Sequence, residues 1–291
     1  MIVGSALFGA AAAGSFGIGD FAARFVGRAI GPPQALLGIM LLGSLGIGIY
    51  VVASGETLVW ELSGLWLLVL NGVATMLATL LLFDAVTRGP VSLGSPIASS
   101  YPAFAVPMTV VFGARPEPIH WVAMAATLGG VWLVALAVSR VDSGDKPDYA
   151  PAVLRRAVPT AIGAAFCFAV AMLAADYAVE RYGLLMTLLS GRIVGAVALG
   201  GAFLVMRRLP RMPLSAWPLI LLITLMDTLA YVLLYAGLAL ENGEFAMVTG
   251  SAYSVVSILL ARVILREPVM PLQWLGVAIV IAGIGTLSAT G

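Results

Sequence analysis

The sequence predicts an all-α integral membrane protein with ten transmembrane helices, arranged as two inverted five-helix repeats. Hydrophobic residues make up 61% of its 291 positions and charged residues 10%, and the mean hydropathy is +1.07. A soluble fold of this length cannot bury that much apolar surface, whereas a bilayer solvates it. The apolar runs are continuous rather than alternating, which favours helices over a β-barrel. Many residues of the first half also recur in the second.

In the first half, turn residues delimit five apolar runs. Residue 1 leads directly into the first run without the positive region of a signal peptide, so we expect a mature spanning helix there. Glycine and proline mark the turns between the runs, as at Gly31-Pro32-Pro33 and Gly89-Pro90. The expected helices cover residues 2–27, 33–54, 62–87, 91–113 and 118–138. The fourth contains Pro96, Pro102 and Pro107, which predict a kinked backbone.

A polar stretch over residues 139–156 follows and cannot cross a membrane. We therefore expect a linker there, between a first repeat over residues 1–138 and a second over residues 157–291. In the second half, Pro210, Pro213, Asn242-Gly243 and Pro268 mark further turns. The expected helices cover residues 157–182, 183–206, 214–240, 243–265 and 270–288.

Residue correspondences between the halves indicate a duplication. Gly19-Asp20-Phe21-Ala22 matches Ala175-Asp176-Tyr177-Ala178 in residue type. Towards the other end of each half, Tyr101 corresponds to Tyr253 and Trp121 to Trp274. An odd number of helices in each half makes the second copy enter the membrane from the opposite face, as in secondary transporters with inverted repeats.

The loop charges predict the orientation. Cytoplasmic loops are enriched in Lys and Arg, and only Arg115 and Arg181 lie in or near the loops after even-numbered helices. The basic residues in or near the loops after odd-numbered helices are Arg24, Arg28, Arg88, Arg140, Lys146, Arg155, Arg156, Arg207, Arg208, Arg211, Arg262 and Arg266. We therefore expect a multi-pass protein of the cell (inner) membrane, with the linker in the cytoplasm and both termini outside.

Two charged residues are predicted near the bilayer midplane, where an ionised side chain costs about 2.5 to 3.5 kcal/mol. Arg192 and Asp227 lie well inside adjacent antiparallel helices, at about 1.5 Å of rise per residue. An arginine binds a carboxylate bidentately and an aspartate binds an ammonium group or a proton, so the pair suits a zwitterionic solute. The alternative is an ion pair that only locks the two helices together. The glycines around Arg192, Gly191 and Gly195, favour close helix packing.

A band of polar and aromatic residues is expected to contact either a substrate or neighbouring helices. Asp227, Tyr231 and Tyr235 are spaced one turn apart and form one stripe, which in lipid must face protein or water. The remaining candidates for substrate contact are Asn71, Ser99, Tyr101 and Tyr253.

Two further aspartates are candidates for gates. Counting from the helix ends places Asp20 at the cytoplasmic mouth and Asp176 at the outer mouth. Arg24 follows Asp20 at i+4, and Glu180 with Arg181 follows Asp176. The alternative is an ion pair that finishes a helix end. Asp84 and Arg88 have the same spacing, and there the ion pair is the favoured interpretation.

Several function classes lack the residues they need. The formal net charge is +1, which gives no basis for nucleic-acid binding. Cys167 and His120 are the only residues of their types, and no nucleotide-binding or zinc-protease motif occurs. We expect no cofactor, no metal site and no enzymatic activity.

The sequence resembles the EamA type of the drug/metabolite transporter superfamily over essentially its whole length. The resemblance is carried by the stretch around Gly19-Asp20-Phe21 with its copy around Asp176, by Arg266-Glu267-Pro268, and by Gln273-Trp274-Leu275-Gly276 with the apolar run to Gly283. The first half has a weaker counterpart, Arg115-Pro116-Glu117-Pro118 with Gly129-Gly130, and His120 stands where the glutamine would be.

This resemblance implies two inverted five-helix halves around a central cavity, and export or exchange of small organic solutes such as amino acids. Together with the candidate residues, it leads us to expect a monomeric secondary transporter that exports an amino-acid-like or amphipathic solute by alternating access. A coupling proton at Asp227 is an extension of this hypothesis. A passive channel for small solutes is the alternative, which saturation and counterflow of solute flux would distinguish from a carrier.

Overall fold

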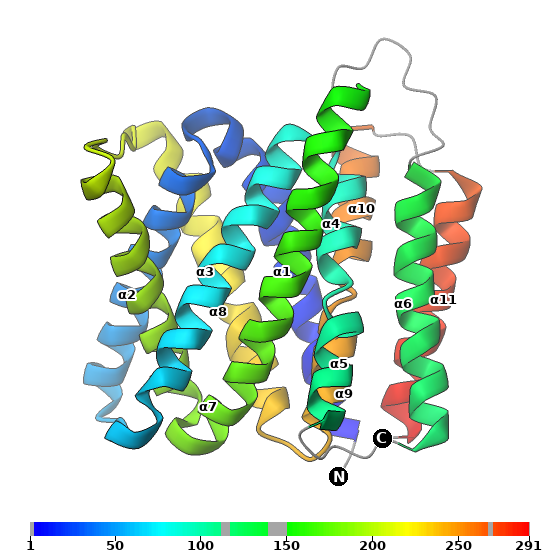
Figure 1. The fold of residues 1–291 in the computed structure, drawn as a ribbon, viewed down its shortest axis with the longest axis horizontal. Coiled ribbons are helices and arrows are strands. Elements are labelled where there is room, and N and C mark those ends of the chain that lie inside the picture. Colours follow the sequence, from blue (N-terminus) through cyan, green and yellow to red (C-terminus); the bar gives the residue numbers. More distant parts are fainter. Residues whose placement is uncertain (1–2, 112–116, 139–149, 267–269, 291) are drawn as a thin grey trace.

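The computed structural model describes residues 3–111, 117–138, 150–266 and 270–290, and every regular element in these ranges is a helix (Figure 1). Six helical segments in them are long and apolar enough to cross a membrane. The helices are α1 (Val3–Ile30), α2 (Pro32–Ser54), the 3₁₀ turn η1 (Leu62–Gly64), α3 (Leu65–Arg88), α4 (Val91–Ser99), α5 (Pro102–Val111), α6 (Pro118–Val138), α7 (Pro151–Val205), the 3₁₀ turn η3 (Leu214–Ala216), α8 (Trp217–Leu238), α9 (Gly243–Gly250), α10 (Tyr253–Ile264) and α11 (Pro271–Thr290).

Helix α7 consists of two helices that meet at Gly183, as the sequence predicted. Gly183 has φ 76° and ψ 166°, a conformation that glycine adopts readily and other residues rarely do. The chain therefore reverses there, and the two parts of α7 run antiparallel (Figure 1). The first part begins at Pro151, earlier than the predicted start at residue 157, because proline is well suited to the first turn of a helix. The predicted linker is helical from that residue on, and its residues 139–149 lie outside the described ranges.

Two of the predicted helices are broken near their middle. The prolines of the predicted helix 91–113 separate α4 from α5 at Ser100 and Tyr101. The predicted helix 243–265 is broken too, at Ser251 and Ala252, although it contains no proline. At each break a serine hydroxyl donates a hydrogen bond to a carbonyl three residues back, over 2.6 Å in both cases: Ser100 to Ile97 and Ser251 to Val248. Tyr101 and Tyr253, which correspond in the repeat, lie at the breaks: Tyr101 is the second residue of the first break, and Tyr253 directly follows the second.

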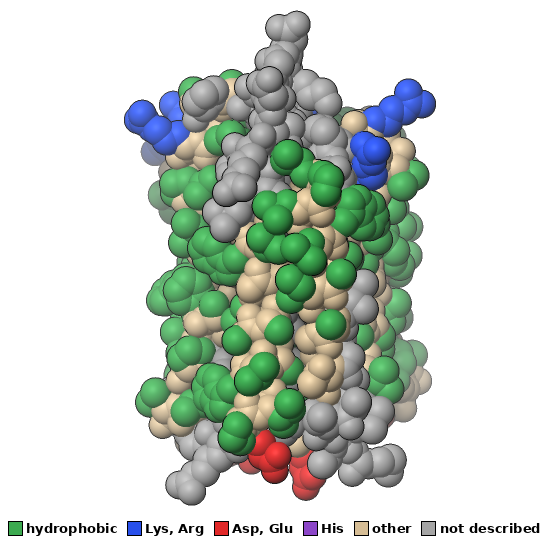
Figure 2. All heavy atoms as spheres, turned by 90° about the vertical axis from the view of Figure 1, so that its right-hand side faces the viewer, with side chains coloured by type: hydrophobic (Ala, Val, Ile, Leu, Met, Phe, Trp, Pro, Cys, Tyr) green, Lys and Arg blue, Asp and Glu red, His purple; other side chains and the backbone are tan. Residues whose placement is uncertain are grey.

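Opposite charges gather at opposite ends of the helix bundle. On the face drawn in Figure 2, Lys and Arg side chains lie at the upper end and Asp and Glu side chains at the lower end. In Figure 1, α1 begins and α11 ends at the lower end, where the Gly183 turn of α7 also lies. The central helices thus span the distance between a basic end and an acidic end.

Small residues let the helices approach one another closely. The main contacts are those of α3 with α7, α1 with α8, and α6 with α11. Gly72 of α3 lies against Val194 and Gly191 of α7, so that a Cβ at Gly72 would be 2.7 Å from the Val194 Cβ. A Cβ at Gly195 would be 2.5 Å from the Met40 sulfur of α2. The glycines around Arg192 therefore pack helices together, as predicted.

We predict that Gly72→Ala lowers the melting temperature of the purified protein. The added methyl would also lie 3.1 Å from the Gly191 carbonyl oxygen, and overpacking of this kind costs about 1–3 kcal/mol. Gly46→Ala is the matched control, because a Cβ at Gly46 meets no atom within 4 Å and alanine is the better helix former. Thermal unfolding in detergent measures both variants, and equal melting temperatures would contradict the close contact between α3 and α7.

Candidate functional site

An ion pair between Arg192 and Asp227 lies at the centre of the candidate site. Arg192 comes from the second part of α7 and Asp227 from α8, and the Arg192 Nη2 atom contacts the Asp227 Oδ2 atom. The Arg192 side chain is 5% exposed and that of Asp227 15%. A charge at this depth in hydrocarbon needs a partner of opposite charge. Arg192 and Asp227 each provide that partner for the other. The pairing expected from the sequence is confirmed.

The polar stripe of α8 faces the interior of the bundle. The Tyr231 ring centroid lies 5.3 Å from the Arg192 guanidinium carbon, within the range of a cation–π interaction. Tyr231 also forms a side-chain hydrogen bond with Thr79 of α3. Its ring contacts the Tyr235 ring edge to face, with 5.5 Å between centroids. Both tyrosines are buried, so the stripe faces protein, one of the two surroundings that the sequence allowed.

Asn71 connects three helices beside this pair. Its side-chain amide nitrogen donates hydrogen bonds to the Ala171 carbonyl over 3.0 Å and to the Tyr235 hydroxyl over 3.3 Å. Asn71 belongs to α3, Ala171 to the first part of α7 and Tyr235 to α8. The side chain is 1% exposed. Asn71 therefore fixes the walls of the site and has little room to contact a solute in this conformation.

A cavity of about 30 Å³ lies next to the ion pair. It has room for about one water molecule. Asp20 of α1 and Asp227 of α8 both line it, together with Tyr101, Tyr231 and Tyr253. The remaining lining residues are Phe16, Thr79, Leu82, Phe168, Met172 and Leu234.

The prediction that Asp20 lies at a cytoplasmic mouth is wrong. Asp20 is 7% exposed and lines the same cavity as Asp227. The error came from the helix end, because α1 continues past Gly27 to Ile30. That leaves roughly 15 Å of helix between Asp20 and the end at 1.5 Å per residue, about half the thickness of a bilayer core.

Two buried polar atoms of the cavity wall lack hydrogen-bond partners among the described residues. They are the Oδ2 atom of Asp20 and the hydroxyl oxygen of Tyr253. A buried polar group without a partner costs about 1–3 kcal/mol. In native proteins such groups are rare and occur at functional sites or beside water. These two atoms therefore mark the part of the wall that is best suited to bind a guest molecule.

The candidates Ser99, at the end of α4, and Tyr101, between α4 and α5, differ in their position relative to the cavity. Tyr101 lines the cavity, and its hydroxyl donates a 2.7 Å hydrogen bond to the Met247 carbonyl of α9. Ser99 is buried but does not line the cavity. Its hydroxyl donates instead to the Pro96 carbonyl of its own helix, over 3.0 Å. The Ser99 hydroxyl thus satisfies a carbonyl beside the break in the helix.

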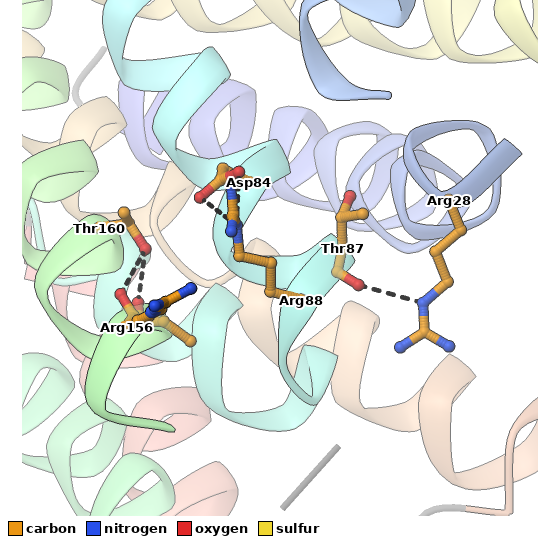
Figure 3. A network of polar contacts seen from close by, with 7 residues as sticks. Arg28, Asp84, Thr87, Arg88, Arg156 and Thr160 are labelled. Carbon is orange, nitrogen blue, oxygen red and sulfur yellow. Dashed lines mark hydrogen bonds and ion pairs between the residues drawn. The ribbon is translucent and has the colours of Figure 1, made fainter. Parts of the chain in front are cut away.

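Arg24, the predicted partner of Asp20, points toward the turn between α3 and α4. Its Nη1 atom donates a 2.8 Å hydrogen bond to the Gly89 carbonyl. At the same end, the Nε atom of Arg28 donates to the Thr87 carbonyl over 3.1 Å (Figure 3). The ion pair of Asp84 with Arg88 is confirmed, with 2.7 Å between Oδ1 and Nε (Figure 3). The hydrogen bonds from Arg24 and Arg28 fasten the end of α1 to the end of α3 and the turn after it, whereas the Asp84–Arg88 pair lies within α3.

Asp176 lies in the first part of α7, roughly 10 Å from the Gly183 turn at 1.5 Å per residue. It is partly buried and interacts electrostatically with Glu244 at the start of α9 and with Glu180. It thus lies toward the acidic end of the bundle, and its predicted place at the outer mouth stays a prediction. A role in gating stays a prediction.

A cluster of polar contacts that was not predicted fastens the acidic end. The Arg181 guanidinium forms an ion pair with Glu61, and its Nη2 atom donates to the Ser63 hydroxyl over 2.5 Å. The Tyr182 hydroxyl donates to the Glu61 carbonyl over 2.6 Å. The hydrogen bond from Arg181, followed by that from Ser63, lowers the pKa of Glu61 to about 2. The connection between α2 and α3 is therefore bound to the turn of α7.

Thr79, Phe16, Phe168 and Met172 line the cavity but were not predicted. Thr79 was accessible to sequence reasoning, because it follows Asn71 and Thr75 at four-residue spacing on one face of α3. The other three are apolar residues in apolar helices. Nothing local distinguishes them from residues that face lipid.

Removing one residue of the buried ion pair should lower the free energy of unfolding far more than replacing both residues. Arg192→Ala leaves Asp227 buried without a cation, a change that typically costs about 3–5 kcal/mol. The double variant Arg192→Met with Asp227→Leu removes both charges, and replacements of this kind are often nearly neutral. Unfolding in detergent should therefore rank the double variant above Arg192→Ala. If the destabilisation caused by single variants at the two positions adds up to that of the double variant, the two charges are not coupled.

The Glu61–Arg181 contact should make a pH-dependent contribution to stability. Because folding lowers the pKa of Glu61 from 4.5 to about 2, the contribution is complete above pH 4.5 and is lost as the pH falls toward 2. Glu61→Gln should lower the melting temperature slightly at pH 6, since the pair is exposed. The difference from wild type should shrink between pH 4.5 and 2. Glu56→Gln, a change of an exposed carboxylate in the same connection, should show no such pattern, and a constant difference for Glu61→Gln would contradict the assignment.

A comparison with solved structures found matches in sixteen chains. One of them, entitled "Crystal structure of protein", superposes with a TM-score of 0.72 at 17% sequence identity. The alignment covers 97% of this chain and 95% of the other. At this identity the likeness establishes the fold. A comparison with curated proteins found no match.

A comparison with protein-family models identified the EamA-like transporter family. Its model matches twice, over residues 4–136 and over residues 155–289. The two matches together span most of the chain, and the resemblance noted in the sequence is thereby confirmed. The protein belongs to the EamA-like transporter family of membrane proteins.

Proposed function

We propose that this protein is a secondary carrier that exports a small zwitterionic, amino-acid-like solute by alternating access. The observation that carries the proposal is the Arg192–Asp227 pair, which offers both charge signs beside a central cavity. Family membership supports transport of a small solute in general. The ion pair, the orphaned polar atoms and the aromatic wall support this solute class.

The chemistry of the site matches the two ends of an amino acid. A guanidinium group presents parallel donors to a carboxylate, and Arg192 is held next to the cavity wall by Asp227 and Tyr231. An ammonium group needs carboxylate oxygens, which Asp227 and the unpartnered Oδ2 of Asp20 supply. The Tyr231 ring, the Phe16 ring and Leu234 suit an apolar side chain. The carboxylate of a bound zwitterion would replace Asp227 as the partner of Arg192, and its ammonium group would replace Arg192 as the partner of Asp227.

The cavity volume indicates a closed conformation. Sites for small organic ligands are typically about 300–1,000 Å³, and this cavity measures about 30 Å³. A solute therefore requires rearrangement of the walls. The breaks at Ser100–Tyr101 and Ser251–Ala252 interrupt two helices beside Tyr101 and Tyr253, which line the cavity, and we expect the walls to move at these points. Discontinuous helices at the substrate site are common in secondary transporters.

We propose ten spans, counting α7 as two and each of the pairs α4–α5 and α9–α10 as one. The first repeat then comprises residues 1–138, and the second residues 157–291. The breaks near the corresponding residues Tyr101 and Tyr253 support inverted repeats. So does the packing of α1 against α8, which matches that of the first part of α7 against α3. We place the basic end and the linker 139–156 in the cytoplasm by the positive-inside rule, with both termini outside, in a monomer of the cell membrane.

Asp20 and Asp227 also provide a site for a coupling proton. The carboxylates of Asp20 and Asp227 both line the small cavity, and among the described residues the ion pair of Arg192 is with Asp227. A coupling proton could therefore bind at this pair of carboxylates. Transport in liposomes should then respond to an imposed pH gradient. Transport that ignores such a gradient would remove the proton from the proposal and leave the carrier.

Loss of the Arg192 guanidinium should abolish export. Cells that express the protein would be loaded with a panel of amino acids, and efflux would be measured after transfer to amino-acid-free buffer. Arg192→Ala should reduce saturable efflux at least tenfold, the loss of about 1.4 kcal/mol of binding or more. Ser99→Ala should retain it, because that hydroxyl bonds its own helix. Monodisperse behaviour in detergent shows that each variant is folded, and normal efflux by folded Arg192→Ala would overturn the site assignment.

A further inference from the structure

A second candidate binding site lies away from the central cavity, at the basic end of the bundle. It is a groove of about 720 Å³ bordered by α2, α3 and the end of α7. Its walls are mainly apolar and include Leu80, Leu199 and Phe203. Arg207, Arg208 and Arg211 line it as well. We call this feature the arginine groove.

The backbone holds the three arginines at the end of α7. Arg207 adopts the left-handed conformation, with φ 52°. The backbone N–H of Arg208 donates a 3.0 Å hydrogen bond to the Phe203 carbonyl and thereby closes the helix end. Pro210 and Pro213 follow and prevent the helix from continuing. The guanidinium groups are thus fixed to a short, constrained segment.

The charge of the arginine groove is uncompensated in the described part of the chain. No Asp or Glu lines the groove. None of the three arginines forms an ion pair with a described residue within 4.0 Å. By contrast, Arg88, Arg181 and Arg192 each contact a carboxylate. Three unpaired cations beside one groove favour an anionic ligand.

The apolar surroundings indicate a ligand with a hydrocarbon tail. Leu209, between the arginines, is 85% exposed, and Leu214, just beyond them, is 87% exposed. Val205, directly before them, is 85% exposed. In a membrane protein, we expect such exposed apolar residues to lie against the bilayer. The groove therefore combines a cationic patch with an adjoining apolar surface. A soluble anion would contact the cationic patch alone, whereas a lipid would contact both.

We propose that the arginine groove binds one anionic phospholipid of the phosphatidylglycerol class. The phosphate lies against Arg207, Arg208 and Arg211, and an acyl chain lies along Leu80, Leu199 and Phe203. Basic pockets between transmembrane helices are known to bind anionic headgroups. The site shares no residue with the central cavity and does not depend on the transported solute.

The test is native mass spectrometry of the whole protein titrated with phosphatidylglycerol or phosphatidylcholine of identical acyl chains. Wild type should retain one phosphatidylglycerol molecule in preference to phosphatidylcholine. Arg207→Gln, Arg208→Gln and Arg211→Gln together should weaken phosphatidylglycerol binding on the order of a hundredfold, from about fivefold for each basic residue. The control combines Arg155→Gln, Arg156→Gln and Arg266→Gln, which remove exposed arginines outside the groove, and it should bind like wild type.

Additional measurements separate the outcomes. Leu209→Ser changes an exposed side chain of the groove and should weaken lipid binding while leaving the fold intact. Equal binding by both triple variants would overturn the proposal, as would equal affinity for the two lipids. Displacement of the lipid by millimolar glycerol 3-phosphate would also overturn it, because a soluble anion would then suffice. Melting temperatures without added lipid show whether the triple variants are folded.

Discussion

The structure of the bundle centre depends on the rule that a charge in hydrocarbon needs a partner. Arg192 and Asp227 satisfy that rule for each other, and their contact fixes the distance between α7 and α8. Gly43 of α2 leaves the space that this arrangement needs, since a Cβ there would lie 3.3 Å from the Arg192 Nε atom. Tyr231 covers the guanidinium from another side. Four helices thus meet around one pair of charges, because Asn71 and Thr79 of α3 bond the tyrosines of α8.

In the proposed mechanism, the same pair holds the empty protein together and binds the solute. A buried ion pair contributes little net stability compared with an apolar replacement, so stability alone does not explain its presence. A zwitterion could exchange with the internal partners, because its carboxylate would take the place of Asp227 and its ammonium group that of Arg192. No charge would be left without a partner at any stage. A solute with one charge would leave one partner of the pair without a counter-charge, which is the reason that we propose a zwitterion.

Sequence reasoning succeeded where a local rule or a strict physical cost applied. The apolar run was correctly divided between residues 182 and 183 because it is too long for one span, and Arg192 with Asp227 were identified because isolated charges are costly in a bilayer. It failed for Asp20, where an error of a few residues at the end of α1 changed the inferred depth. The break at Ser251 could not be foreseen, since no proline marks it. Phe16, Phe168 and the Glu61–Arg181 contact depend on which distant helices meet, and no local pattern encodes that.

The central claim is that the site at Arg192 and Asp227 is exposed alternately to the two sides. Counterflow in proteoliposomes tests it most directly. Vesicles would be loaded with an unlabelled amino acid that raises the melting temperature of the purified protein, and uptake of the same labelled amino acid would be followed. A carrier that works by alternating access predicts saturable uptake, accelerated and transiently concentrated by the internal amino acid. Uptake that rises linearly with concentration and ignores the internal amino acid would contradict the account and indicate a passive channel.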